Sequence, residues 1–158
     1  QEGRAFSGVL YGGLIKTPDG IKVIEFNARF GDPETEVVLP RLKSDAVDVF
    51  MAVANGEQPV AEWSDKATLG IVLASKGYPG SYDKGAVIRG LDCVESTVYH
   101  MGTALKDIEY VTAGGRVMIV VAEADSLVAA QQKARADVKK IECDNLFYRS
   151  DIGAKAFK

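Results

Sequence analysis

Two oxygen-bearing side chains, Glu25 and Asn27, stand two residues apart in a segment typical of a β-strand. The neighbouring Val23, Ile24 and Phe26 suit a pleated, half-buried surface. Residues two apart on a strand point to the same face with their Cα atoms roughly 6.5 Å apart, so both side chains can converge on one hard cation. The spacing therefore predicts a divalent-cation site. For Glu25 the alternative is a solvated carboxylate at the edge of a strand.

The residues that follow add charge and a turn. Arg29 has a planar fork that suits oxyanions, although a salt bridge to Asp32 or Glu34 is the alternative. The strand breaks at Gly31, and Asp32-Pro33 is typical of a helix N-cap followed by proline in the first helical position. A helix N-terminus favours anions, although Glu34 already places negative charge there. This arrangement predicts a site, while Asp32 could equally serve as a purely local cap.

The elements that must position these residues can be predicted around them. Ser7–Lys16 is a predicted strand, and the Thr17–Gly20 turn should join it to the strand of Glu25 as an antiparallel hairpin. A helix is expected from Asp32 to about Lys43, with Pro40 ending or kinking it. A second helix should begin after Ser44-Asp45 and stop at Asn55-Gly56.

The segment Glu57–Asp65 has no clear hydrophobic periodicity, which indicates a connecting loop. We therefore predict two domains, residues 1–60 and residues 61–158. The second should be mostly antiparallel β with one long helix, which gives an α+β chain overall. Its expected elements are strands at 67–75, 86–89, 97–103, 110–112 and 116–123, and a helix capped by Asp125-Ser126 with Leu127, Ala130, Ala134, Val138 and Ile141 on one face.

Two further sites are candidates in the second part. Gly114-Gly115 precedes Arg116, and a turn of two glycines can expose backbone N–H groups beside an arginine that suits a phosphate. The alternative is an ordinary hairpin turn. His100 could act as a general base, but a lone histidine on a short strand is more often packed or hydrogen-bonded.

Composition excludes several classes of protein. With 158 residues, 47% hydrophobic content and a net charge of −3, the chain predicts a globular protein that binds neither nucleic acid nor membrane. No run approaches the roughly 18 apolar residues of a membrane span. Cys93 and Cys143 lack metal spacing, which favours free thiols in a reducing cytoplasm. The start at Gln1, without methionine or signal segment, indicates a piece of a longer protein.

Several motifs together carry a resemblance to a known family. Glu25–Thr35 resembles the signature of the phosphoribosylamine–glycine ligase family, also called glycinamide ribonucleotide synthetase, within the ATP-grasp superfamily. In the segment His100–Thr103, Met101 stands where the family has alanine, and this difference puts little of the resemblance in doubt. Further segments resemble this family in the same order, namely Ala74–Gly80, Tyr82–Gly85, His100–Thr103, Gly114–Val117 and Tyr148–Gly153.

The resemblance implies the C-terminal part of an ATP-grasp antiparallel sheet, followed by the family's C-terminal domain. It also implies an N-terminal α/β domain and an ATP-grasp lobe elsewhere in the parent enzyme, which carry its phosphate-covering loop and nucleotide-gripping lysine. The implied reaction joins glycine to 5-phosphoribosylamine with ATP, giving glycinamide ribonucleotide, ADP and phosphate. Magnesium or manganese is the expected cofactor.

The resemblance also assigns roles. Glu25 and Asn27 match the metal and ATP-binding positions. Arg29, Asp32 and Glu34 are the expected catalytic residues, and the expected substrate-binding residues are Arg29, Asp32, Pro33, Glu34 and Arg116, the last on the phosphate of 5-phosphoribosylamine. The fragment alone should be inactive. The alternatives are a noncatalytic binding or assembly module and another ATP-grasp ligase of purine synthesis.

Overall fold

The structure is a computed structural model that describes residue 3 and residues 5–157. The chain divides into two compact units, Gln1–Ser64 and Asp65–Lys158, which are described separately below. Antiparallel sheets and a few helices confirm the predicted α+β class. The domain boundary after residue 60 stays a prediction.

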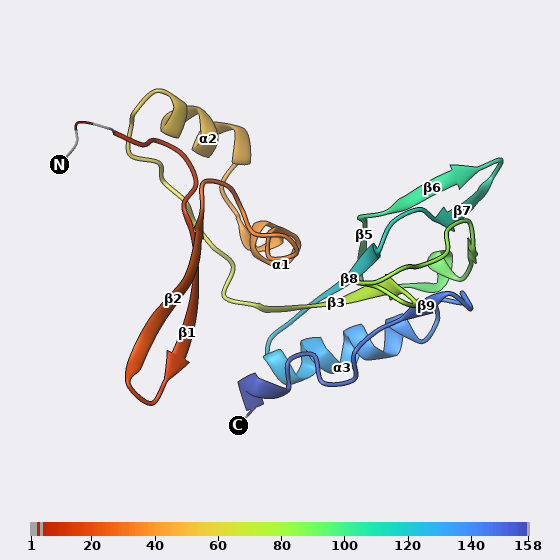
Figure 1. Cartoon of the computed structure of the whole chain (residues 1–158). Coiled ribbons are helices and arrows are strands. Elements are labelled where there is room, and N and C mark those ends of the chain that lie inside the picture. Colours follow the sequence, from red (N-terminus) through yellow and green to blue (C-terminus); the bar gives the residue numbers. More distant parts are fainter. Residues whose placement is uncertain (1–2, 4, 158) are drawn as a thin grey trace. The chain divides into compact units, whose positions relative to one another are not determined.

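The first unit is built on an antiparallel hairpin, as predicted. Strands β1 (Tyr11–Thr17) and β2 (Gly20–Asn27) pair from Tyr11 opposite Asn27 to Thr17 opposite Gly20, and they form the long two-stranded ribbon of Figure 1. Strand β1 begins four residues later than the predicted Ser7. Most side chains of β2 are exposed, including the apolar Ile24 and Phe26.

The helix predicted from Asp32 to Lys43 is wrong in its extent. Helix α1 covers only Thr35–Val38, and a 3-10 turn, Leu39–Arg41, follows it. The cap position is Glu34, which makes no side-chain capping bond, so Asp32 is not the N-cap. Pro40 lies inside the 3-10 turn, where its missing N–H cannot continue an α-helix.

The second helix agrees with its local signals. Helix α2 spans Ala46–Ala54, and the Asp45 carboxylate accepts hydrogen bonds from the N–H groups of Val47 and Asp48. Asn55 closes the helix, and Gly56 follows with φ of 75°. The loop after Gly56 runs back beside the end of the 3-10 turn, where Leu42 and Trp63 form an isolated bridge.

The second unit contains two antiparallel sheets. One sheet has the order β5-β8-β3-β9, and the other has the order β4-β7-β6. The strands are β3 (Ala67–Ser75), β4 (Val87–Ile88), β5 (Thr97–His100), β6 (Thr103–Lys106), β7 (Glu109–Thr112), β8 (Arg116–Ala124) and β9 (Leu146–Phe147). Short 3-10 turns cover Leu91–Cys93 and Ala154–Phe157.

One predicted strand is wrong. The segment predicted as a single strand at 97–103 divides between the two sheets, because β5 ends at His100 and β6 begins at Thr103. Gly102 lies between them, and a Cβ there would come 2.8 Å from the Gly114 Cα. Close backbone packing at Gly102 therefore turns the chain from one sheet into the other.

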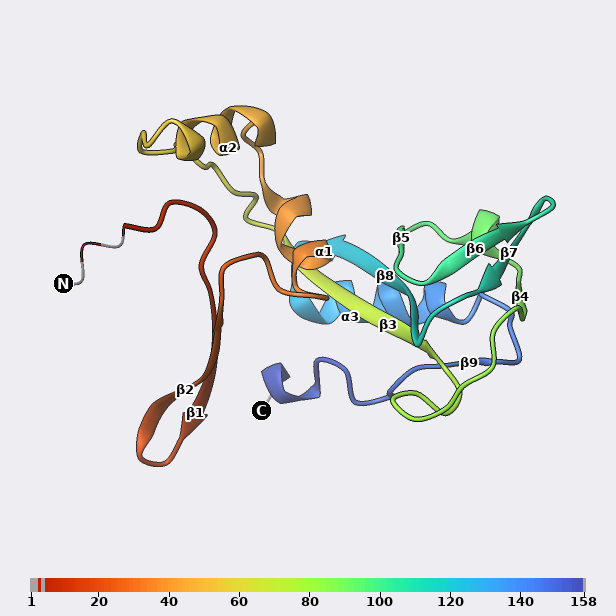
Figure 2. The same ribbon diagram turned by 45° about the horizontal axis from the view of Figure 1, so that its top comes forward.

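The core of the second unit lies between its four-stranded sheet and helix α3 (Leu127–Val138), which runs along β3 and β8 in Figures 1 and 2. Ser126 caps the helix by accepting from the Ala129 N–H. The predicted apolar stripe is confirmed for the helix, although Ile141 lies beyond its end. The packed residues of both elements include Leu69, Ile71, Leu73, Val117, Val120, Ala130, Ala134 and Val138.

Helix α3 also holds the segment that follows β9. Gln131 Nε2 donates to the Ile152 carbonyl oxygen at 2.8 Å, and Arg135 Nη2 donates to that of Ser150 at 2.7 Å. Both cysteines are free thiols, as predicted. Among the described helices, none has the length and apolar character needed to cross a membrane.

Candidate active site

Glu25 and Asn27 both lie on β2, as the sequence predicted. Glu25 is paired with Gly13 and Asn27 with Tyr11 across the ladder, and paired residues of an antiparallel ladder share a face. The ladder shifts register between Gly13 and Leu14, immediately beside Glu25. One face of the hairpin therefore carries Glu25, Asn27 and Tyr11.

The glycine pair of β1 makes room for the side chains of β2. A Cβ on Gly13 would come 3.1 Å from the Glu25 Cγ, and one on Gly12 would lie 3.5 Å from the Phe26 ring. The groups near these glycines are the side chains of Glu25 and Phe26, so Gly13 leaves space for the Glu25 side chain.

Asn27 bears on whether a cation fits. Its side-chain amide nitrogen is buried and has no hydrogen-bond partner among the described residues. A buried unpaired amide N–H group is rare in native proteins and indicates a missing hydrogen-bond acceptor, such as an anionic oxygen. Carboxylate and amide oxygens are the donors that Mg²⁺ prefers, and Mg²⁺ needs few of them because it keeps waters and phosphates as its other ligands. In residues 3 and 5–157, no cluster of three or more His, Cys, Asp and Glu side chains could hold a metal. Glu25 and Asn27 thus fit a cation with two protein ligands.

The turn after β2 carries the other predicted residues. Arg29 is exposed, and its Nη1 donates to the Phe30 carbonyl oxygen at 2.9 Å. Asp32 is also exposed, whereas Pro33 and Glu34 are half-buried and the Asp32-Pro33 peptide bond is cis. The Gly31 carbonyl oxygen accepts from the Thr35 N–H at 3.0 Å and from the Thr35 hydroxyl. These bonds fix the turn that ends at Glu34.

Tyr11 is a residue of this site that the sequence did not single out. Its hydroxyl donates to Glu34 Oε1 at 3.2 Å, although 23 residues separate the two. The negative charge of Glu34 is the largest of the effects that raise the pKa of Tyr11, followed by burial, and Glu25 contributes in the same direction. Arg29 opposes them. The structure thus brings Tyr11, Glu25, Arg29 and Glu34 into one electrostatic environment.

Arg116 begins β8 in the second unit. Gly114-Gly115 is not a hairpin turn, because β7 and β8 belong to different sheets. The Gly114 N–H is also not exposed, since it donates to the Gly102 carbonyl oxygen at 2.9 Å. The Gly115 carbonyl oxygen accepts from the Ser75 N–H at 2.8 Å, and the Gly114 carbonyl oxygen accepts from the Ser75 hydroxyl at 2.9 Å. The segment before Arg116 is therefore a fixed connection between sheets.

His100 is exposed and makes the hydrogen bond that was its alternative. Its Nδ1 lies 2.9 Å from the Thr103 hydroxyl, and its ring lies 4.6 Å from that of Tyr110 in a tilted arrangement. Both partners come from the neighbouring three-stranded sheet. His100 thus links the two sheets of the second unit.

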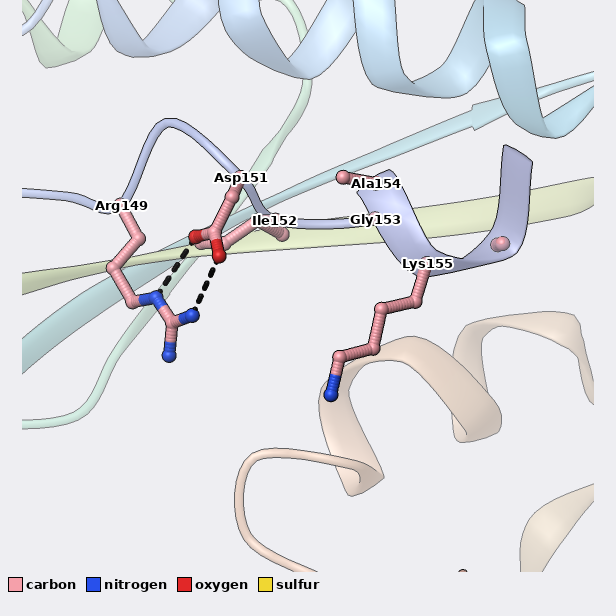
Figure 3. Close-up of a pocket in the computed structure, with 7 residues that line it drawn as sticks. Arg149, Asp151, Ile152, Gly153, Ala154 and Lys155 are labelled. Carbon is pink, nitrogen blue, oxygen red and sulfur yellow. Dashed lines mark hydrogen bonds and ion pairs between the residues drawn. The ribbon is translucent and has the colours of Figure 1, made fainter. Parts of the chain in front are cut away.

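An open cleft of about 570 Å³ lies beside the C-terminal 3-10 turn. Figure 3 shows Arg149 directed at Asp151 in this cleft, with bonds of 2.9 and 2.6 Å, while Lys155 extends away from that pair. These bonds to Arg149 lower the pKa of Asp151. The fork of Arg149 is engaged by Asp151, and none of the residues predicted for the site lines this cleft.

Comparisons with known proteins cover both units. The family model described as "Phosphoribosylglycinamide synthetase, C domain" matches residues 68–155, and the one described as "Phosphoribosylglycinamide synthetase, ATP-grasp (A) domain" matches residues 1–35. A phosphoribosylamine–glycine ligase of Halalkalibacterium halodurans is 55% identical over 99% of this chain and 37% of that protein. The trifunctional purine biosynthetic protein adenosine-3 of Gallus gallus is 47% identical over 99% of this chain and 16% of that protein.

A crystal structure of phosphoribosylamine–glycine ligase from Thermotoga maritima matches with a TM-score of 0.80 and 31% identity, covering 91% of this chain and 36% of that one. The chain spans 37% of the length of the Halalkalibacterium relative. The C-domain match alone covers more than half of the chain, and the motifs that suggested the resemblance lie in the matched regions or beside them. The chain belongs to the phosphoribosylglycinamide synthetase family.

Proposed function

We propose that this chain supplies the metal-binding and substrate-contacting half of an ATP-dependent ligase that joins glycine to 5-phosphoribosylamine. The products would be glycinamide ribonucleotide, ADP and phosphate. The observation that carries the proposal is one hairpin face on which Glu25 and Asn27 lie together, with the side-chain amide nitrogen of Asn27 buried and without a hydrogen-bond partner among the described residues. The relatives named phosphoribosylamine–glycine ligase, which align over nearly the whole chain, support it.

Glu25 and Asn27 would hold Mg²⁺ or Mn²⁺. The cation supplies charge neutralisation for the phosphates of ATP, which carry most of the charge that develops during phosphoryl transfer. The Asn27 amide group can also donate to an anionic oxygen, which would satisfy the nitrogen that is buried without a partner. Both residues would therefore contact the bound nucleotide complex from the same face of β2.

The turn after β2 would contact the acid and the amine that are joined. Arg29 is exposed and can pair its fork with an acyl phosphate or a carboxylate. Asp32 and Glu34 supply carboxylates for an ammonium group or for ribose hydroxyls, and Pro33 shapes the backbone between them. Arg116, in the second unit, would contact the phosphate of 5-phosphoribosylamine, although the Gly114 N–H cannot assist it.

The proposed partners are small molecules and the remainder of the ligase. ATP, glycine and 5-phosphoribosylamine are the proposed ligands, and N-terminal lobes of a longer enzyme would supply the nucleotide-gripping side. The apolar side chains of β2 are exposed in this unit, which agrees with a missing neighbour. We place the protein in the cytoplasm, where purine precursors are made.

A chimera tests the proposal. In it, residues 1–158 replace the matching portion of the Halalkalibacterium halodurans relative. We expect it to form glycinamide ribonucleotide only when ATP, glycine and 5-phosphoribosylamine are all present, while the 158-residue chain alone forms none. A chimera that unfolds cooperatively and binds ATP yet makes no product would instead favour a noncatalytic binding module.

A further inference from the structure

The side chain of Glu34 is held from two sides. On one side, the Tyr11 hydroxyl donates to its Oε1 at 3.2 Å. On the other, its carboxylate lies so close to Gly31 that a Cβ on Gly31 would overlap Oε2. The Gly31 backbone is itself fixed, since its carbonyl oxygen accepts from Thr35. Glu34 is therefore hydrogen-bonded by Tyr11 and lies against the backbone of Gly31.

Tyr11 also joins two separate parts of the site. It lies opposite Asn27 in the ladder, so its ring shares the face of Asn27 and Glu25. Its hydroxyl reaches the turn that ends at Glu34, beyond the end of β2. A carboxylate oxygen can only accept, so the Tyr11 hydroxyl is the donor in this hydrogen bond. The contact thus ties the turn to the face with the oxygen donors.

The geometry points to Tyr11 as a positioning residue that, with Gly31, holds the Glu34 carboxylate where it binds the amino group of a small substrate. The inference rests on the proposed ligase function. A carboxylate that accepts one phenolic hydrogen bond keeps several acceptor sites, so it can still receive the N–H groups of an ammonium ion. Tyr11 itself does not touch the reacting atoms.

The first test uses the 158-residue chain and does not depend on activity. In nuclear magnetic resonance spectra, Tyr11→Phe should shift the amide signals of Gly31, Glu34 and Thr35, because it removes only the hydroxyl that restrains the turn. Tyr148→Phe, in the other unit, is the matched control and should leave those signals in place. Unshifted signals in Tyr11→Phe would overturn the assignment.

The second test uses the chimera. Both Tyr11→Phe and Gly31→Ala should raise the KM for one amine-bearing substrate, either glycine or phosphoribosylamine, by about tenfold, the effect of misplacing one charge-assisted hydrogen bond. The KM for ATP should stay within about twofold, because ATP carries no ammonium group for Glu34 to bind. An equal loss for all three substrates would show a merely structural role and overturn the assignment.

The role of Tyr11 and the proposed function fail in different ways. An active chimera whose Tyr11→Phe variant has unchanged KM values contradicts the role of Tyr11 alone. A folded wild-type chimera without ligase activity contradicts the proposed function, and the role of Tyr11 in amine binding falls with it. Selective loss in Tyr11→Phe, with full activity in Tyr148→Phe, supports both.

Discussion

The Asp137 carboxylate lies 2.7 Å from the Lys140 ammonium at the end of α3 and is only 2% exposed. It also accepts from the backbone N–H of Ser96 at 2.8 Å. Lys140 in turn reaches the Glu95 carboxylate at 3.0 Å. The Asp137–Lys140 pair therefore ties the end of α3 to the segment that enters β5.

This pair predicts a pH-dependent stability. Burial raises the pKa of Asp137, but hydrogen bonds from Lys140 and Ser96 outweigh it and lower the pKa from 3.8 to about 2. Because the folded pKa lies below the unfolded one, the stabilisation is fully present above about pH 4 and is lost as the pH falls towards 2. Asp137→Asn should cost about 2 kcal/mol in urea unfolding at pH 7, since it removes the charged acceptor of the hydrogen bonds from Lys140 and from the Ser96 N–H.

The control for this prediction is Asp92→Asn, at an exposed position of the same unit. It should change the free energy of unfolding by less than about 0.5 kcal/mol. The acid-induced loss between pH 4 and 2 should also shrink in Asp137→Asn but not in Asp92→Asn. Equal free energies and equal pH profiles for the two variants would contradict the buried pair.

A second prediction concerns the connection before Arg116. A Cβ on Gly115 would overlap the ring of Tyr78, so Gly115→Ala should lower the free energy of unfolding by about 2 kcal/mol through overpacking. Removing the ring with Tyr78→Ala should make the added Gly115→Ala change nearly neutral. A double-mutant cycle in urea measures this coupling, and additive effects would argue against the contact.

A third prediction concerns Arg116 in the chimera. Arg116→Ala should raise the KM for phosphoribosylamine by about tenfold or more, because a charge-assisted bond to phosphate is lost. The KM for glycine, which has no phosphate, should not change. Arg116→Lys should recover part of the loss, since it restores the charge without the fork. An unchanged KM in Arg116→Ala would exclude Arg116 from the phosphate site.

Local signals predicted much of the fold. The β1–β2 hairpin follows from turn residues between two apolar runs, and the start of α2 follows from the capping carboxylate of Asp45. Both signals involve residues that are close together in the sequence. The apolar stripe on α3 was predicted from helical spacing, and the packing of this stripe against the four-stranded sheet confirms it. The placement of Glu25 and Asn27 on one face could be predicted from the two-residue period of a strand alone.

The errors have tertiary causes. The Asp32 cap is wrong because the turn is fixed by bonds of Gly31 to Thr35 and by the contact of Glu34 with Tyr11, which comes from 23 residues away. The strand predicted at 97–103 is divided because Gly102 packs against the backbone of Gly114. Neither contact leaves a pattern in the local sequence, and the same holds for the role of Tyr11.

Metal dependence, measured in the chimera, tests the proposed site most directly. We expect Glu25→Gln and Asn27→Leu each to lower kcat/KM for ATP by about 100-fold or more and to weaken Mn²⁺ binding detected by electron paramagnetic resonance, because each removes a hard oxygen donor. Glu57→Gln, in the loop after α2, should match the wild type. Wild-type Mn²⁺ binding and turnover in Glu25→Gln and Asn27→Leu would contradict the proposal that β2 carries the metal ligands.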